Sequence, residues 1–173
     1  MVLIFLLTFS ISSYAVDVLS EAVKAYENGD YTLAQKGFKV AAKKGNAQAE
    51  YNLGYMFEQG QGVKQNYKIA LAWYEKSALQ GYVDAQYNTA TFYYKGIGVE
   101  QNYEKAIYWY TQAAKNADVT SMYNLGLIYL NGKIVKKNKI TAFQYFLEAA
   151  KRSHLKAQDN LDILCKESPW ACQ

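Results

Sequence analysis

Residues that could carry out covalent chemistry are few in this chain, and they lie near its C-terminus. The 173 residues include a single histidine, His154, so any histidine-dependent catalytic group would rest on it alone. Beside it, Ser153 and Lys156 have the Ser-x-x-Lys spacing of serine enzymes that recognise β-lactams. Those enzymes also require Ser-Asp-Asn and Lys-Thr-Gly segments, and the sequence contains neither. The residues therefore predict no catalytic site, and we expect Ser153 to occupy a helix-ending turn.

The two cysteines, Cys165 and Cys172, lie seven residues apart with Pro169 and Trp170 between them. In an oxidising compartment, a cysteine pair that closes a short loop is expected to form a disulfide, which would attach the C-terminal tail to the preceding helix. The alternative is two separate thiols, one buried and one on a frayed tail. A structural metal site needs about four ligands, more than this sequence groups together, so we expect no metal and no cofactor.

The repeat pattern of the sequence has a period of 36 residues. Asn52-Leu53-Gly54 recurs as Asn88-Thr89-Ala90 and again as Asn124-Leu125-Gly126. The same offset relates further glycines, asparagines, alanines and aromatic residues, of which the first copies are Gly60, Asn66, Ala70, Trp73, Tyr74 and Ala78. So many matches at one offset indicate a repeat architecture rather than a chance likeness.

Each period predicts two helices joined by a glycine-containing turn. The first helix is expected from about Ala47 to Gln59, because apolar residues recur there at helical spacing. The second is expected to begin after Asn66, whose side chain can accept from the free backbone N–H groups of a first turn. Equivalent capping residues precede the other second helices, namely Asp30, Asn102 and Asn138. The second helix carries one amphipathic stripe, formed by Ala70, Trp73, Tyr74, Ser77 and Ala78.

The unit Ala49-x3-Leu53-Gly54-x2-Phe57-x2-Gly60-x-Gly62-Val63, followed by Ala70-x2-Trp73-Tyr74 and Ala78-x2-Gly81, resembles the Sel1-like repeat. This family is related to the tetratricopeptide repeat, and the resemblance covers about residues 46–153 as three successive units. It implies an all-α fold, an α/α solenoid in which antiparallel helix pairs stack into a right-handed superhelix. A divergent first unit and a C-terminal capping helix are expected at the two ends.

The repeat register sets the expected domain boundaries. A divergent tetratricopeptide-like unit is predicted at 16–45, Sel1-like repeats at 46–81, 82–117 and 118–153, and a capping helix with its tail at 154–173. Residues 1–15 are interpreted as a secretory signal, because an apolar run from Val2 to Phe9 precedes Ser13 and Ala15, which suit cleavage after Ala15. No Lys or Arg precedes the run, so a buried N-terminal helix is the alternative. We expect a periplasmic or secreted protein with no membrane span after signal removal.

The first helix of each repeat leaves a face free of core residues. In tetratricopeptide-like solenoids, which the chain resembles, first helices line the concave surface where partner peptides lie. The free face of the first helices includes Lys95 and Asn131. Invariant asparagines could instead bond to neighbouring backbone and hold the repeats together, an alternative that the sequence leaves open. The candidate partner-binding residues are Gln48, Tyr51, Asn52, Tyr55, Asp84, Tyr87, Asn88, Thr91, Tyr94, Tyr123, Asn124 and Leu127.

The formal net charge is +4, and a lysine cluster lies at Lys133, Lys136, Lys137 and Lys139. The cluster could contact an acidic partner or nucleic acid, but an exposed, solvated loop is the simpler interpretation. No aromatic-studded basic motif of a nucleic-acid-binding fold accompanies it, so we expect no nucleic-acid partner.

The sequence therefore predicts a monomeric, exported, non-enzymatic adaptor that binds a protein or peptide. The resemblance to secreted Sel1-like proteins brings one alternative, a β-lactam-binding or β-lactamase-like protein. A host-directed secreted virulence factor is another, which the sequence does not distinguish from a periplasmic adaptor. The β-lactam-associated relatives carry a cysteine pair in each repeat, whereas here the only two cysteines lie in the tail.

Overall fold

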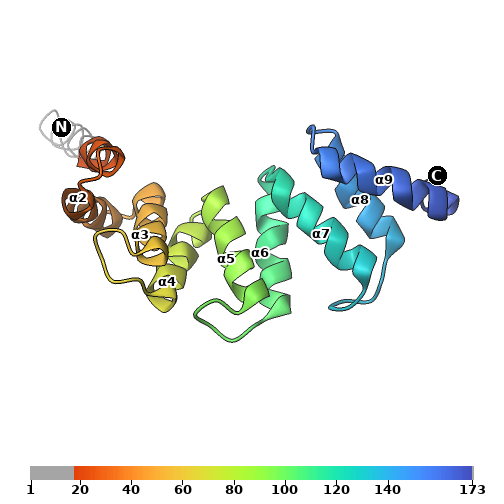
Figure 1. Cartoon of the computed structure of the whole chain (residues 1–173), viewed down its shortest axis with the longest axis horizontal. Coiled ribbons are helices and arrows are strands. Elements are labelled where there is room, and N and C mark those ends of the chain that lie inside the picture. The colour runs from red at the N-terminus through yellow and green to blue at the C-terminus, as the bar shows by residue number, and fades with distance from the viewer. Residues whose placement is uncertain (1–17, 173) are drawn as a thin grey trace, which may run out of the picture. The chain divides into compact units, whose positions relative to one another are not determined.

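The computed structural model describes residues 18–172, and that part of the chain is all α-helical (Figure 1). A helical segment at 18–27 is followed by helices of nearly equal length. These are α2 (Tyr31–Lys43), α3 (Ala47–Gln59), α4 (Tyr67–Leu79), α5 (Val83–Lys95), α6 (Tyr103–Lys115), α7 (Val119–Asn131), α8 (Lys139–Ala150) and α9 (Leu155–Glu167), then the 3₁₀ helix η1 (Pro169–Cys172). The predicted α/α solenoid of repeating helix pairs is confirmed. The expected signal at 1–15 lies outside the described residues.

The chain divides into two compact units, which are described separately below. Unit 1 consists of Met1–Ala85 and Ile97–Val99, and unit 2 of Gln86–Gly96 and Glu100–Gln173. Within residues 18–172, no helix is long and apolar enough to cross a membrane.

The second helix of each pair begins where the sequence predicts, because a side-chain carboxylate or amide caps it. The Oδ1 atoms of Asp30, Asn66, Asn102 and Asn138 accept from the backbone N–H three residues later, at N···O distances of 2.9 to 3.0 Å. Each bond satisfies one of the N–H groups that an isolated first turn leaves unpaired. Replacement of such a cap by alanine typically costs about 1 kcal/mol.

In unit 1, a single apolar cluster joins the N-terminal segment, α2 and α3. Phe38, Leu53 and Met56 are fully buried there, together with alanines that let the helices approach closely. Gly54 allows α3 to approach α4 closely, because a Cβ added to it would lie 2.7 Å from Cδ1 of Tyr74. In unit 2 the equivalent contact is between Gly126 and the ring of Phe146. The repeat thus places a small residue on its first helix at the point where an aromatic ring of its second helix packs against that helix.

Two buried polar side chains each tie the first helix of a repeat to the end of the second helix of the same repeat, and the sequence patterns did not indicate them. Glu50 in unit 1 is 6% exposed and accepts a hydrogen bond from Nε2 of Gln80 at 2.6 Å. In unit 2, Gln86 is buried and accepts from Nδ2 of Asn116 at 2.9 Å. A buried polar group is stable only when it is paired, so these partners allow polar residues inside the helix packing.

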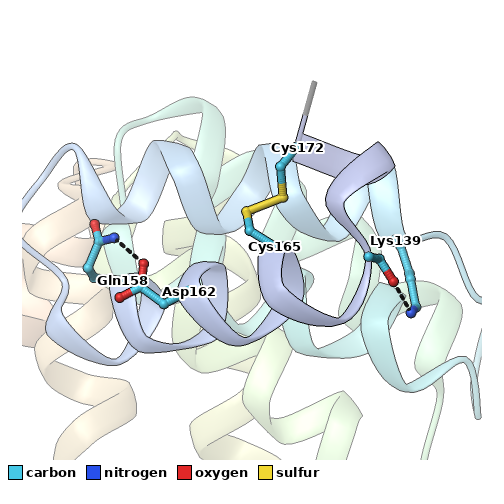
Figure 2. Close-up of a disulfide and its surroundings, with 6 residues drawn as sticks. Lys139, Gln158, Asp162, Cys165 and Cys172 are labelled. Atoms are coloured by element: carbon cyan, nitrogen blue, oxygen red, sulfur yellow. Dashed lines mark hydrogen bonds between the residues drawn. A yellow bond between two sulfur atoms is a disulfide. The ribbon is translucent and has the colours of Figure 1, made fainter.

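The C-terminal end of unit 2 is closed by a disulfide between Cys165 and Cys172, whose Cα atoms lie 5.7 Å apart (Figure 2). The bridge fastens η1 to α9, and Lys139 at the start of α8 donates a hydrogen bond to the Ser168 hydroxyl (Figure 2). Cys165 is half-exposed, whereas its neighbour Leu164 is buried.

Candidate functional site

A hollow of about 310 Å³ opens in unit 2 between α5, α6 and α7. Aromatic rings, short polar side chains and aliphatic side chains share its walls. Its lining residues are Tyr87, Thr91, Tyr94, Lys95, Tyr110, Asn124, Leu127, Ile128 and Asn131. Five of them are candidate partner-binding residues, namely Tyr87, Thr91, Tyr94, Asn124 and Leu127, and Lys95 and Asn131 lie on the same predicted face.

A smaller hollow of about 130 Å³ adjoins the first, because the two share Tyr94, Ile128 and Asn131. Its remaining lining residues come from the start of α6 and from the turn after α7, and they are Tyr103, Lys133 and Ile134. We refer to the two hollows together as the groove. It lies within unit 2.

Tyr110 forms the buried wall of the larger hollow. Its side chain is 3% exposed, and its hydroxyl lies 3.1 Å from Oγ1 of Thr91. Burial is the main cause that raises the pKa of Tyr110 to about 12, because a phenolate would lose its hydration there. Hydrogen bonds from Thr91 and Asn124 act in the opposite direction, whereas the neighbouring Tyr87 and Tyr94 add to the increase. The Tyr110 hydroxyl is therefore neutral and held in place as a hydrogen-bonding group.

The tyrosines at the same position of each repeat pack against the second helix of their own hairpin. The ring of Tyr51 lies 5.6 Å from that of Tyr74, and the ring of Tyr87 lies 6.0 Å from that of Tyr110. Tyr123 lies 5.9 Å from Phe146 and stacks on His154 at 4.5 Å. These residues are half-buried, so they hold the hairpin together and expose only part of each ring.

Two asparagines at the same repeat position, Asn124 and Asn160, have internal roles in unit 2. Asn124 hydrogen-bonds to Tyr110, and Nδ2 of Asn160 donates to the backbone carbonyl of Lys156 at 2.7 Å. Asn124 nevertheless lines the hollow, whereas Asn88 and Tyr123 do not.

The remaining predicted residues lie in unit 1 and do not join the groove. Gln48, Tyr55 and Asp84 are exposed there, and Tyr51 and Asn52 are half-buried. In the larger hollow, Tyr110 and Ile128 were missed because helical periodicity assigns both to the core, and in the smaller hollow Tyr103 and Ile134 were not singled out. No sequence signal separates Tyr110 from Tyr74, which occupies the same repeat position in unit 1 and is fully buried.

The residues near the C-terminus form a helix cap. Nδ1 of His154 accepts from the backbone N–H of Ala157 at 3.2 Å and so caps α9. Ser153 occupies the preceding turn with a φ of 64°, and Ser153 and Lys156 are both exposed. Neither residue lines the groove. Within residues 18–172, no three His, Cys, Asp or Glu side chains are grouped so that they could hold a metal ion.

Several solved structures, including the following two, are similar to this one. A Sel1 repeat protein from Oxalobacter formigenes has 28% sequence identity and a TM-score of 0.77, over 85% of this chain. A protective antigen present in uropathogenic Escherichia coli strains, which displays an SLR fold, has 31% identity and a TM-score of 0.81, over 87% of this chain. The chain spans 59% of the first protein and 33% of the second. No curated protein matches it significantly.

Sel1 repeats match the chain at residues 47–82, 83–118 and 119–154, which is more than half of its length. These three segments contain the hairpins that carry the recurring tyrosines, asparagines and caps. Sel1 repeat proteins generally mediate protein–protein interactions. On the strength of these three matches and the helix pairs that they cover, the chain belongs to the Sel1 repeat family.

Proposed function

We propose that the groove of unit 2 binds an extended peptide segment of a partner protein, without chemical turnover. The observation that carries this proposal is the groove itself, in which three helices bring aromatic, aliphatic and amide side chains around one hollow. Concave sites of mixed polarity with a few fixed hydrogen-bonding groups are typical of specific recognition.

The lining suits a peptide because each part of the groove matches one part of an extended chain. Leu127 and Ile128 offer an aliphatic wall for one large apolar side chain, beside the ring of Tyr94. Asn124 and Asn131 carry amides, which can both donate to and accept from a peptide backbone. Tyrosine rings add contact area at a low cost in conformational entropy.

Differences between the repeats account for the position of this site. The position of Thr91 holds Tyr55 in the first repeat and Leu127 in the third, and the position of Tyr94 holds Glu58 and Leu130. Positions that vary between repeats while the framework stays constant are the ones that set specificity in a solenoid.

The test is selection of peptides from a random display library against the purified chain, followed by binding curves measured by fluorescence polarisation. Tyr94→Ser and Leu127→Asp each change the groove wall, and each should weaken a selected peptide by roughly tenfold or more, as expected for anchor contacts. Tyr108→Ser is the matched control, because Tyr108 is a 55% exposed tyrosine of α6 that does not line the groove. It should leave affinity unchanged.

Two results would contradict the proposal. One is that no peptide is selected by the folded chain; the other is that Tyr94→Ser and Tyr108→Ser weaken binding equally. Circular dichroism of each variant checks that the helical fold is retained.

We also propose that the chain acts outside the cytoplasm. The Cys165–Cys172 disulfide supports this, because disulfides persist mainly in oxidising compartments. Fractionation of the native host, with mass analysis of the N-terminus, is the test. A chain that begins at Val16 in the envelope or medium is the expected result, whereas a cytosolic chain that retains residues 1–15 would contradict it.

A further inference from the structure

We propose that the groove selects an acidic peptide segment that carries one large apolar side chain. This inference rests on the proposed function and adds the chemistry of the partner. It follows from the distribution of charge between the two units and around the groove.

All of the net positive charge of the chain resides in unit 2. This unit contains eleven lysine and arginine residues against seven aspartate and glutamate residues, which accounts for the entire formal charge of +4. Unit 1 contains equal numbers of the two classes. The excess charge therefore belongs to the unit that contains the groove.

The charged residues that line the groove are both basic. Lys95 lies at the edge of the larger hollow and Lys133 at the edge of the smaller one, and both are exposed. No carboxylate lines either hollow, and neither lysine makes an ion pair within residues 18–172. A peptide in the groove would therefore meet two ammonium groups and no carboxylate from the lining.

The turn after α7 extends this basic edge. Lys136 and Lys137 follow Lys133 in the turn and are exposed, so they add positive potential at the end of the groove. Lys139, the fourth lysine of the cluster, instead donates a hydrogen bond to Ser168. The cluster thus divides into three exposed lysines beside the groove and one lysine with a structural role.

The first repeat differs from the second because it carries a carboxylate at the corresponding site. There Glu58 occupies the position of Tyr94, and its carboxylate accepts a hydrogen bond from Tyr74. In unit 2 the corresponding hydroxyl, that of Tyr110, bonds to the neutral Thr91 instead. The aromatic scaffold is the same, but the second repeat, unlike the first, carries no carboxylate at this position.

The ring geometry favours a peptide over a nucleic acid. Single-stranded nucleic acids bind where bases can stack on open aromatic faces. The ring of Tyr94 packs edge to face with those of Tyr103 and Tyr110, at centroid distances of 5.6 and 6.3 Å. Tyr87 is likewise tilted by 55° against Tyr110. The tyrosines are packed together and do not form a row of parallel stacking platforms.

The test uses four synthetic probes and the purified chain with its disulfide intact. The first probe is a short peptide with a central leucine flanked by glutamates. In the second, glutamine replaces each glutamate, and in the third, alanine replaces the leucine. A single-stranded oligonucleotide is the fourth. Binding is measured by fluorescence polarisation at low and at physiological salt.

The glutamate peptide should bind the native chain about five- to tenfold tighter than the glutamine peptide at low salt, and this ratio should shrink as salt rises. Replacing the leucine by alanine should weaken binding by a similar factor or more. The double variant Lys95→Gln/Lys133→Gln should lose most of the preference for glutamate, so that the ratio of the two affinities approaches one. The matched control Lys115→Gln/Lys156→Gln removes the same charge from exposed lysines of unit 2 outside the groove, and should keep the preference.

The possible failures are distinguishable. If the native chain binds the glutamate and glutamine peptides equally, the acidic partner is wrong and the peptide groove stands. If the two double variants lose the preference equally, general charge rather than the groove lysines is responsible, which also overturns the inference. If no peptide from the probes or the library binds, the proposed function itself fails. Lysine-dependent binding of the oligonucleotide without peptide binding would assign the surface to nucleic acid instead.

Discussion

At the residue scale, Tyr110 combines a structural role with a position in the groove wall. It packs against Tyr87 and Tyr94, and its hydroxyl is fixed by Thr91 and Asn124. Because the ring is buried, its side chain can ionise only at strongly alkaline pH. A group whose protonation differs between the folded and unfolded chains makes the free energy of unfolding depend on pH.

The replacement Tyr110→Phe should therefore have a pH-dependent effect. The pKa of Tyr110 is raised from 10.0 to about 12 in the folded chain. Above about pH 10 the unfolded chain releases this proton while the folded chain retains it, so stability is lost as pH rises, by about 1.4 kcal/mol for each pH unit. At about pH 8 the variant should be less stable by about 1 kcal/mol, because the hydrogen bond to Thr91 is lost.

Between about pH 10 and pH 12 the difference in stability between the native chain and Tyr110→Phe should shrink or reverse, because phenylalanine does not ionise. Urea unfolding followed by circular dichroism, at about pH 8 and about pH 11, measures it. Tyr26, Tyr82 and Tyr145 also have raised pKa values, mainly through burial, but they are present in both proteins and do not affect the comparison. A stability difference that is the same at both pH values would show that the ionisation of Tyr110 does not change the free energy of unfolding.

At the element scale, the turns that follow the second helices share a left-handed residue at one repeat position. Gly45 and Gly81 occupy it with φ of 79° and 87°, whereas Ala117 and Ser153 adopt 68° and 64°. A residue with a Cβ is strained in this conformation, and glycine is not. The repeat register thus imposes a turn for which the later repeats lack the best residue.

Ala117→Gly should raise stability by roughly 0.5 to 1 kcal/mol, because relief of strain exceeds the added entropy of the unfolded chain. Gly81→Ala is the reciprocal change and should lower stability by a similar or larger amount. A Cβ at Gly81 would meet no atom within 4 Å, so its effect reports backbone strain alone. Thermal unfolding of both variants is the measurement, and changes of the same sign in both would contradict the explanation.

Much of the element layout could be predicted because helix caps and turns are local. The four capping residues Asp30, Asn66, Asn102 and Asn138 mark the starts of their helices in sequence and in structure alike. Buried polar ties such as Glu50–Gln80 could not be predicted, because their partners lie 30 residues apart and look like ordinary surface residues. The groove was half predicted: periodicity identifies a face, but the hollow depends on how individual rings such as Tyr110 pack.

At the scale of the whole molecule, the described helices contact chiefly their neighbours along the chain, so each end depends on a local cap. In unit 2 that cap is α9 with η1, which the Cys165–Cys172 disulfide and the Lys139–Ser168 hydrogen bond hold in place. Without the bridge, only the backbone at Ser168 and non-covalent contacts would hold η1 beside α9.

Replacing Cys172 by serine should destabilise the C-terminal cap by about 2 to 3 kcal/mol, the value expected for a disulfide that closes a loop of this size. Hydrogen–deuterium exchange should rise in α9 and η1 and stay unchanged in α2 and α3, which lie in unit 1. Trp170→Ala is the control, because it alters an exposed residue of η1 and leaves the bridge intact. Equal changes in exchange across both units would show that the bridge does not act locally.

The neighbour-to-neighbour packing also constrains how such a chain can change length. Inserting or deleting one whole period of 36 residues leaves every helix with a partner of the same kind on either side, because caps, turns and small-residue contacts recur at that spacing. An insertion of another length within a helix would place a cap or a ring against the wrong face. Gene duplication in units of one repeat is therefore the mutational step that this architecture tolerates, while the variable groove positions within each copy remain free to diverge.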